Sequence, residues 1–352
     1  MSPFRRLDRQ RLNLEQKLTR AEVEGLASDP ALKVIQCDSP IEPPTWDLLN
    51  EVLFVRRPDI ELRLYGFYSS VCDLSFLHQI TNVRRFSADC LRNVVGIEHL
   101  ACMVNLDELS IGVFNIESFD FLELIPVGIK SLSLEATKSK KPRLDALVRF
   151  RSLRKLYLEG QQQGIEVLSE LPTLEEITLR SISTKDLNYV SGLQRLWSLD
   201  VKLGGIRDFS SIAGKQSIKY LELWQVRGLS DLGFISSLTG LQYLFLQSMR
   251  NVTKVPDLSK LSRLRRLHLE KMKGLKDVSA IAHAPVLEEF SHFSAQNVAP
   301  EMYSDLLKMT SLKSVRVGFG SRKKNEDFAE LAIRCGKNLD AGGKLAEKFV
   351  FI

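Results

Sequence analysis

The sequence has 352 residues, 44% of them hydrophobic and 26% charged, with a formal net charge of +6. This composition is typical of soluble proteins, and the small charge excess gives no strong indication of nucleic-acid binding. No run of 18 apolar residues is present to cross a membrane. The charged N-terminal stretch also lacks the apolar core of a signal peptide. We therefore expect a cytoplasmic protein whose five cysteines are free, buried thiols.

The N-terminal part differs from the rest of the chain. Residues 1–28 carry apolar side chains at partly helical spacing, from Leu7 to Val23, which predicts a helix. A second helix is expected after Pro43-Pro44. We interpret residues 1–58 as an N-terminal helical cap that also contains a candidate first strand at Leu32-Ile35-Cys37. A partner-binding arm is the alternative for residues 1–28.

From residue 59 onward one pattern, L-x-x-L-x-L, dominates the chain. About twelve copies follow one another at intervals of 21 to 25 residues up to residue 320. The two apolar residues of each L-x-L share one face of a strand, and one strand cannot bury that face alone. Stacked copies would form a parallel sheet with one continuous core. Clear copies are Leu153-Leu156-Leu158, Leu174-Ile177-Leu179, Ile218-Leu221-Leu223, Leu241-Leu244-Leu246 and Leu264-Leu267-Leu269.

The second half of each repeat returns the chain to the start of the next strand. It often contains an Asp-apolar-Ser sequence, whose Asp and Ser favour helix starts by accepting bonds from free backbone N–H groups. Only about eight residues are available, so a single turn or a 3₁₀ segment is expected. The sequences are Asp73-Leu74-Ser75, Asp208-Phe209-Ser210, Asp257-Leu258-Ser259 and Asp277-Val278-Ser279.

These residues resemble the leucine-rich-repeat family, particularly its short 22–23-residue class in internalin-like and other bacterial proteins. The resemblance covers roughly residues 59–320. It implies an α/β fold, a right-handed solenoid with a concave parallel β-sheet, short helical or 3₁₀ convex segments and helical end caps. Residues 321–352 would form the C-terminal cap, with a helix near 325–335. The usual Asn or Cys at the ninth repeat position is absent, and we expect its apolar replacements to fill the core: Phe114, Ile182, Val226, Met249 and Met272.

No motif for catalysis or metal binding is present. The sequence lacks GxGxxG, GxxxxGK[ST], HExxH and GxSxG, and its five histidines are not clustered with carboxylates or cysteines at metal-ligand spacing. His292 occupies an inward strand position, where a hydrogen-bonded core histidine is expected. We therefore predict that the protein is not an enzyme and uses no cofactor.

The repeat pattern predicts which side chains share a surface. The third, fifth and seventh repeat positions face the concave side, and equal positions of successive repeats become neighbours about 4.8 Å apart. Acids border the resulting aromatic surface, among them Asp200 and Glu222. Grouped aromatic side chains are typical of a binding hot spot, and the alternative is cross-strand stacking that only stabilises the sheet. The rings expected to converge are Tyr220, Trp224, Tyr243, Phe245, His268 and Phe293.

These features favour a non-enzymatic protein-recognition module that binds a partner protein on its concave face. The bordering acids indicate a partner with a basic contact surface. By analogy, such a protein resembles an inhibitor or an immunity protein that neutralises a toxin or an enzyme. Two alternatives stay open: a nucleic-acid-associated scaffold using basic loops such as residues 138–143, and a substrate-recruiting subunit of an enzyme complex.

Overall fold

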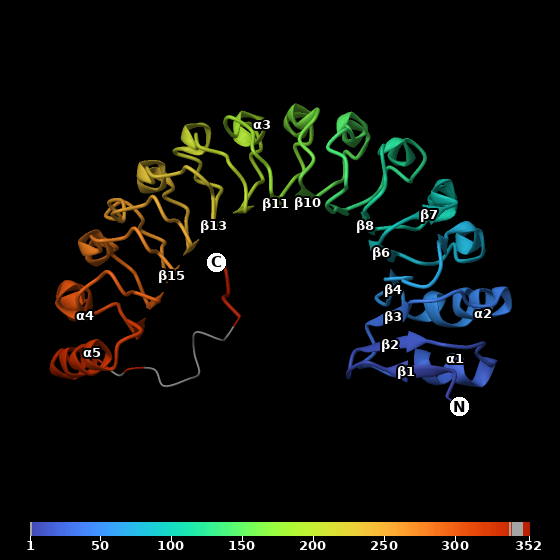
Figure 1. Cartoon of the computed structure of the whole chain (residues 1–352), viewed down its shortest axis with the longest axis horizontal. Coiled ribbons are helices and arrows are strands. Elements are labelled where there is room, and N and C mark those ends of the chain that lie inside the picture. The colour runs from blue at the N-terminus through green and yellow to red at the C-terminus, as the bar shows by residue number, and fades with distance from the viewer. Residues whose placement is uncertain (1, 338, 340–347) are drawn as a thin grey trace. The chain divides into compact units, whose positions relative to one another are not determined.

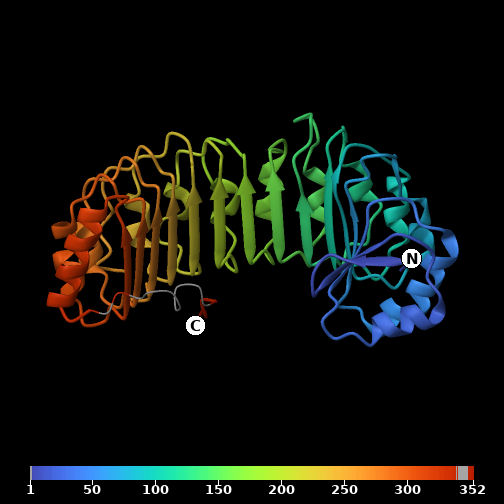
Figure 2. The same ribbon diagram turned by 60° about the horizontal axis from the view of Figure 1, so that its bottom comes forward.

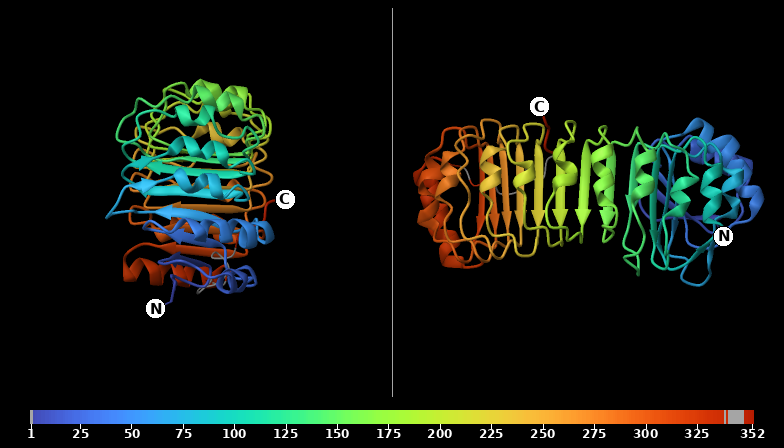
Figure 3. Two further views of the ribbon diagram at one scale, coloured as in Figure 1. Left: turned by 90° about the vertical axis from the view of Figure 1, so that its right-hand side faces the viewer. Right: turned by 90° about the horizontal axis from the view of Figure 1, so that it is seen from above.

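A computed structural model describes residues 2–337, 339 and 348–352 and divides into two compact units, residues 1–174 (unit 1) and 175–352 (unit 2). Within each unit, strands line one side and short helical segments return the chain along the other (Figure 1; Figure 3). This is the arrangement that the repeat pattern predicts, because each L-x-L buries one strand face against the returning segment. No helix in the described part of the chain has the length and apolar character needed to span a membrane.

Unit 1 contains a mainly parallel sheet in the order β1-β2-β3-β4-β6-β8-β9-β10, in which only β1 and β2 pair antiparallel. A second, two-stranded parallel sheet joins β5 to β7. The strands are β1 (Phe4–Arg6), β2 (Arg11–Leu14), β3 (Val34–Cys37), β4 (Glu61–Tyr65), β5 (Cys72–Asp73), β6 (Arg85–Leu91), β7 (Val94–Val95), β8 (Glu108–Val113), β9 (Ser131–Leu134) and β10 (Lys155–Glu159). The helices are α1 (Arg20–Ala27) and α2 (Pro43–Leu48), with a π-helix η1 (Leu49–Phe54) and 3₁₀ segments η2 (Ser75–Gln79), η3 (Ile97–Cys102), η4 (Asp120–Glu123), η5 (Asp145–Arg149) and η6 (Ile165–Glu170).

Unit 2 contains parallel strands that follow one another in sequence order from β11 to β17 (Figure 2). Each strand pairs with the next without a shift in register, so equivalent repeat positions stand side by side. The strands are β11 (Glu176–Arg180), β12 (Ser198–Lys202), β13 (Tyr220–Trp224), β14 (Tyr243–Gln247), β15 (Arg266–Glu270), β16 (Glu289–Phe293) and β17 (Ser314–Gly318). The return segments include α3 (Asn188–Ser191), η7 (Ser210–Ile212), η8 (Gly233–Ser237), η9 (Ser279–His283), η10 (Pro300–Tyr303) and α4 (Ser304–Lys308), and α5 (Arg322–Arg334) follows the last strand.

The repeat leucines form the core of both units. In β14, Leu244 and Leu246 are fully buried, whereas Tyr243, Phe245 and Gln247 on the alternate face stay partly exposed. Each buried leucine of this kind contributes about 2 kcal/mol of transfer free energy. The period-two alternation therefore gives each strand a buried face, which packs in the core, and an opposite face directed to solvent. We call the surface formed by these solvent-directed faces the strand side.

The ninth-position residues bury as expected in unit 2, where Ile182, Val226, Met249 and Met272 are at most 4% exposed. The expectation is wrong for Phe114, which is 49% exposed. The pairing of β6 with β8 shifts register between Ala88 and Leu91, so Val113 takes the inward position one residue earlier. The ring of Phe114 is consequently left outside the core.

The Asp-apolar-Ser sequences start the return segments as predicted. In each, an Asp side-chain oxygen accepts a hydrogen bond from the backbone N–H of the Ser, at 2.8 to 3.1 Å. In three of the four, that Ser is the first residue of a 3₁₀ segment, namely η2, η7 and η9. The side-chain bond satisfies a backbone donor that the short segment cannot pair internally.

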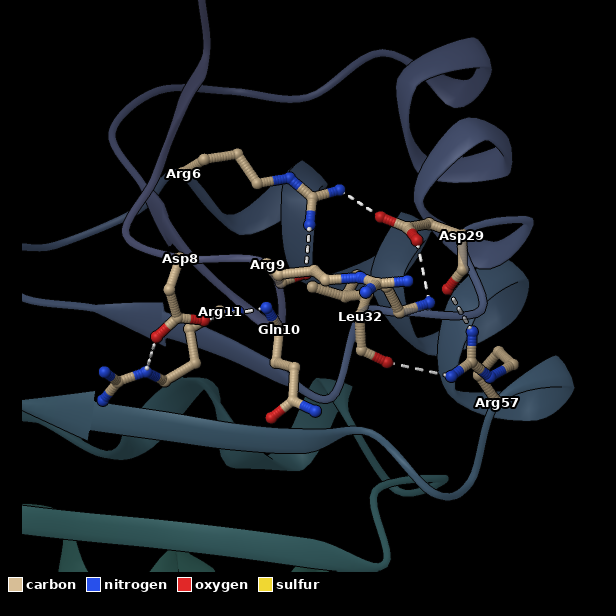
Figure 4. Close-up of polar contacts among 9 residues, drawn as sticks. Arg6, Asp8, Arg9, Gln10, Arg11, Asp29, Leu32 and Arg57 are labelled. Carbon is tan, nitrogen blue, oxygen red and sulfur yellow. Dashed lines mark hydrogen bonds and ion pairs between the residues drawn. The ribbon is translucent and has the colours of Figure 1, made fainter. Parts of the chain in front are cut away.

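The helix predicted for residues 1–28 is wrong for its first half. The antiparallel strands β1 and β2 precede α1, and β2 pairs in parallel with β3. Asp8 closes the turn between the two strands by accepting backbone N–H bonds from Gln10 and Arg11 (Figure 4). Leu12 and Leu14 are fully buried, at the period-two spacing of a strand. The helices predicted near residues 43–49 and 325–335 are present as α2 and α5.

Arginine side chains tie this N-terminal hairpin to the following elements (Figure 4). Arg6 pairs with the carboxylate of Asp29. Arg57 donates to the carbonyl oxygens of Asp29 at 2.7 Å and Leu32 at 2.9 Å. These contacts fix the loop that connects α1 to β3 against the end of η1.

The cysteines carry free thiols, but the expectation that all are buried is only partly correct. Cys37 and Cys72 are buried, and Cys90 is exposed. Burial raises the pKa of the Cys72 thiol to about 12, so this group stays protonated at neutral pH.

A residue in the left-handed conformation directly follows every strand from β11 to β16, and none of these residues is glycine. Their φ angles lie between 50° and 60°, and from β11 to β15 the backbone N–H of this residue donates to a carbonyl of the next strand. This conformation strains an L-residue by about 1–2 kcal/mol. The residues are Ser181, Leu203, Gln225, Ser248, Lys271 and Ser294.

Gln225→Gly is expected to stabilise unit 2 by about 0.5–1 kcal/mol, because glycine adopts the left-handed conformation without steric cost and loses only part of this gain to its greater freedom when unfolded. The Gln225 side chain is exposed, so few contacts are lost. Urea unfolding followed by circular dichroism would measure the change. Gln225→Ala keeps the strain and serves as the control; equal effects of the two substitutions would contradict the explanation.

Candidate functional site

The register of unit 2 brings the sequence-predicted site residues together on its strand side. Tyr220 stands opposite Tyr243, Glu222 opposite Phe245, and Asp200 opposite Glu222. The next pairings place Phe245 opposite His268 and Glu270 opposite Phe293. Residues about 23 positions apart in the chain thus become direct neighbours. We call the six rings Tyr220, Trp224, Tyr243, Phe245, His268 and Phe293 the aromatic cluster.

Ring contacts connect most of the aromatic cluster. Tyr220 meets Tyr243 edge-on at 5.1 Å between ring centroids, and Phe245 meets His268 edge-on at 4.5 Å. Phe293, which is 37% exposed, lies 5.5 Å from His268. The cross-strand stacking that was the alternative to a binding surface is therefore present. It leaves the rings partly exposed, so stacking and binding are compatible roles for the same side chains.

Trp224 differs from the other rings of the aromatic cluster because two cationic side chains lie beside it. The Arg180 guanidinium and the Lys202 ammonium each lie 5.9 Å from its ring centroid. Such positions allow cation–π attraction from within the protein. A partner cation would therefore compete with Lys202 and Arg180 for the face of this ring.

As whole residues, Asp200 and Glu222, which we call the acidic pair, are only 8% and 7% exposed. They share the ammonium of Lys202. The Lys202 Nζ lies 2.6 Å from an oxygen of Asp200 and 3.2 Å from one of Glu222. Burial, reinforced by the charge of Glu222, raises the pKa of Asp200 to about 6 despite the opposing effect of Lys202. The Tyr220 hydroxyl donates to Glu222 at 2.5 Å, which fixes that carboxylate within the cluster.

The two histidines of this region have different environments. His268 Nδ1 shares a hydrogen bond of 2.7 Å with the hydroxyl of Ser291 on the strand side, and burial lowers the pKa of this imidazole. His292 points inward and is fully buried, with its Nδ1 2.7 Å from the hydroxyl oxygen of Tyr303. Burial lowers the pKa of His292 to about 4, so it is neutral at pH 7, as expected of a hydrogen-bonded core histidine. In the described ranges, no group of three or more His, Cys, Asp and Glu side chains is arranged to hold a metal ion.

No family model and no curated protein matches the sequence. Solved structures do match the fold. An internalin (InlF) of Listeria monocytogenes aligns with 78% of this chain and 88% of its own, at 17% identity and a TM-score of 0.50. A leucine-rich-repeat protein of Leptospira interrogans aligns with 92% of both chains, at 15% identity and a TM-score of 0.53. TLR13, solved in complex with ssRNA13, aligns with 87% of this chain and 57% of its own, at 16% identity and a TM-score of 0.52.

The chain has the leucine-rich-repeat fold. At these identities the comparisons establish the architecture, and it agrees with the parallel strands and 3₁₀ return segments described above. In a leucine-rich repeat the side chains of the strand side are free of the core, so they are the positions at which a site can vary without loss of the fold.

Sequence reasoning missed one occupant of the leucine-rich-repeat surface. The segment Lys348–Ile352, which we call the C-terminal segment, lies against the starts of β13, β14 and β15 (Figure 2). Phe351 contacts Tyr220 at 6.2 Å, and Phe349 contacts Tyr243 at 5.4 Å. Two rings of the aromatic cluster, Tyr220 and Tyr243, are thus already in contact with the C-terminal segment of the same chain.

Residues at the second repeat position also belong to this surface and were not predicted. Trp197, Gln242 and Arg265 directly precede the strands and contact the C-terminal segment. Their size and polarity were the sequence signal for a binding role. A residue that served only to connect the turn to the strand would not need a large aromatic or hydrogen-bonding side chain. The alternating Phe349 and Phe351 were a second signal, since period-two aromatic residues indicate an extended segment with one buried face.

Proposed function

We propose that the chain is a non-enzymatic protein-recognition module that binds a partner protein on the strand side of unit 2. The observation that carries this proposal is the aromatic cluster, which gathers on one face in partly exposed positions. Tyrosine, tryptophan and phenylalanine bury large areas with little loss of rotamer freedom, which is why they dominate binding hot spots.

The part of the surface that includes Phe245 and the strand-end residues Trp224 and Phe293 is the better one for a partner. Trp224 lies at the end of β13, four residues and therefore about 13 Å beyond Tyr220, whose ring touches the C-terminal segment. Phe293 ends β16 in the same way and is 37% exposed. A partner contacting these rings would cover apolar surface that water now touches.

The proposed partner presents a basic contact surface. Asp200 and Glu222 outnumber the Lys202 ammonium that they share. This charge pattern attracts Lys or Arg side chains at the rim and would steer their approach. The finer form of the proposal is an inhibitor or immunity protein of the cytoplasm that neutralises a toxin or an enzyme.

The Trp224→Ala, Phe245→Ala double variant is expected to lose the partner that the wild-type chain captures from its native host. Removing both rings should lower the affinity at least tenfold, or about 1.4 kcal/mol, because the truncated side chains leave the partner's contact surface without its hot spot. The measurement is affinity capture followed by titration with the purified partner. The double variant must show the same circular dichroism as wild type.

Phe234→Ala is the matched control, because this ring packs against Phe209 in the return segments and not on the strand side. Equal capture by wild type and the double variant would contradict the proposed location. Binding that collapses between low and moderate salt would instead support the nucleic-acid alternative, since phosphate contacts are strongly salt-dependent. An aromatic-centred protein contact should persist at moderate salt.

A further inference from the structure

The C-terminal segment runs across the strands of unit 2 instead of pairing with them as a further strand. Its contacts extend from Arg266 at the start of β15, through Tyr243 at the start of β14, to Tyr220 at the start of β13. The segment therefore lies across a row of side chains from successive repeats, and we call this row the groove. The sequence between α5 and this segment, residues 335–347, connects it to the body of the unit.

Two aromatic side chains of the segment face the groove. The Phe349 ring lies 4.7 Å from the Arg265 guanidinium carbon and 5.0 Å from that of Arg266, so two cations hold one ring. The Phe351 ring meets Trp197 edge-on at 5.1 Å. The two phenylalanines also contact one another at 4.8 Å. The rings form one continuous apolar contact on the groove.

The backbone of the segment is recognised as well. Ile352 N–H donates to the Gln242 side-chain carbonyl at 3.0 Å, and the Gln242 amide donates back to the Ile352 carbonyl oxygen. Arg265 donates to the carbonyl oxygen of Val350 at 2.5 Å. Gln242 is itself fully buried, so its amide is held in place for this pairing. Main-chain bonds of this kind contribute affinity for any extended peptide, whereas contacts to the rings contribute specificity.

The other side chains of the segment point away from the groove. Val350 is 70% exposed and Ile352 is 75% exposed. The alternation of covered and exposed side chains is that of an extended chain with one buried face. The two rings that contact the groove are thus separated by one residue whose side chain is exposed.

We propose that the groove formed by Trp197, Tyr220, Gln242, Tyr243, Arg265 and Arg266 is a binding site for extended peptides that carry an aromatic-x-aromatic motif, and that the C-terminal segment occupies it as a ligand in cis. This inference rests on the proposed function, because it states what the partner inserts beside the aromatic cluster. A partner with the same motif must displace the C-terminal segment before it binds. A cis ligand on a short connection acts at an effective concentration of about 1 mM, so a weak intramolecular contact is enough to close the groove.

The test uses a fluorescein-labelled peptide of sequence Lys-Phe-Val-Phe-Ile, identical to residues 348–352, and fluorescence anisotropy. The receptor is the full chain, as wild type and as the Phe349→Ser, Phe351→Ser double variant, which frees the groove without shortening the chain. We expect the double variant to bind the peptide at least tenfold more tightly than wild type, because it removes the competing cis ligand. A Lys-Ser-Val-Ser-Ile peptide, which keeps the backbone but lacks both rings, should bind at least tenfold more weakly.

Gln242→Ala in the double variant should weaken peptide binding roughly tenfold, because the paired backbone hydrogen bonds are lost. Gln247→Ala is the matched control, since Gln247 faces the same side at the other end of β14 and should leave peptide binding unchanged. Equal peptide affinity of wild type and the double variant would overturn the cis occupancy. Absence of binding to the double variant, with a wild-type circular dichroism spectrum, would overturn the peptide site itself.

The result of the peptide-binding test can be distinguished from the result of the partner-capture test of the proposed function. Trp224→Ala, Phe245→Ala removes rings that are not among those touching Phe349 or Phe351 in the described contacts. This variant should bind the peptide like its parent even where partner capture is lost. Loss of capture with intact peptide binding supports both statements, and intact capture with intact peptide binding contradicts only the role of the aromatic cluster.

Discussion

Gly240→Ala is expected to lower the stability of unit 2 by about 3 kcal/mol, at the upper end of overpacking effects, and its melting temperature by about 10 °C. Gly240 is buried in the turn just before the first leucine of its repeat. A Cβ atom at this position would lie 1.9 Å from the carbonyl oxygen of Gln216 and 2.9 Å from its carbonyl carbon. Because both atoms belong to the backbone of the preceding repeat, no side chain can rotate away, and the two turns must move apart.

The displacement would be transmitted to the paired strands. Just after this turn, the N–H groups of Gln242 and Tyr243 donate to the carbonyl of Lys219 at 2.8 and 3.0 Å. Thermal unfolding followed by circular dichroism would measure the effect. Ser217→Ala is the matched control, because Ser217 occupies the same repeat position one repeat earlier and already carries a Cβ. A Gly240→Ala variant that melts like the Ser217→Ala variant would show that the turns separate without cost.

Lys202→Met is expected to destabilise unit 2 by about 3 kcal/mol at pH 8, because it leaves the two carboxylates of the acidic pair without their shared cation. The side chains involved are 21% exposed for Lys202, 12% for Asp200 and 10% for Glu222, so water screens them only weakly. Methionine keeps much of the aliphatic volume of lysine, which limits the contribution of lost packing. Urea unfolding followed by circular dichroism would measure the loss.

The effect should depend on pH in a defined direction. The pKa of Asp200 is raised in the folded state to about 6, above its unfolded value, so the folded protein binds this proton more tightly. Its contribution to stability is therefore most favourable below about pH 4 and is lost as the pH rises to about 6, by about 3 kcal/mol in total. Removal of Lys202 raises this pKa further, so the difference between variant and wild type should be small at pH 4.5 and largest at pH 8.

A double-mutant cycle separates charge from packing. In the Asp200→Asn background the buried charge is gone, and Lys202→Met should then cost less than half of its effect in wild type. Asp200→Asn alone should also flatten the fall in stability between about pH 4 and 6 relative to wild type. An effect of Lys202→Met that is the same at pH 4.5 and pH 8 would show that packing, and not the acidic pair, determines the loss.

The strand side of unit 2 could be predicted from the sequence because it depends on local period and on repeat length alone. Tyr220, Tyr243 and Arg266 share a row since each occupies the third position of its repeat and the repeats are nearly equal in length. Asp200 and Lys202 were readable in the same way as side chains two residues apart on one strand. Their depth of burial was not readable, because it depends on the bulk of the rings around them.

Other features could not be read from local patterns. The alternation of Phe349 and Phe351 indicates an extended segment but does not show where it binds, because Ile352 contacts Gln242 across 110 residues of sequence. The N-terminal error has a different origin. Leu7, Leu12 and Leu14 fit a partial helical spacing, but the turn closed by Asp8 and the pairing of β2 with β3 favour strands. Tertiary pairing outweighs a weak helical preference at such positions.

Because β11 to β17 pair in constant register, equivalent outward side chains of successive repeats form rows on the strand side of unit 2. The residues of each row can be substituted independently of the other rows. The side chains of Tyr243, Phe245 and Gln247 lie outside the core, whereas those of Leu244 and Leu246 between them are buried in it. Exchanging such outward triplets, repeat by repeat, offers a way to redirect the module to new ligands on an unaltered framework. Natural variation among such chains should likewise concentrate in these rows.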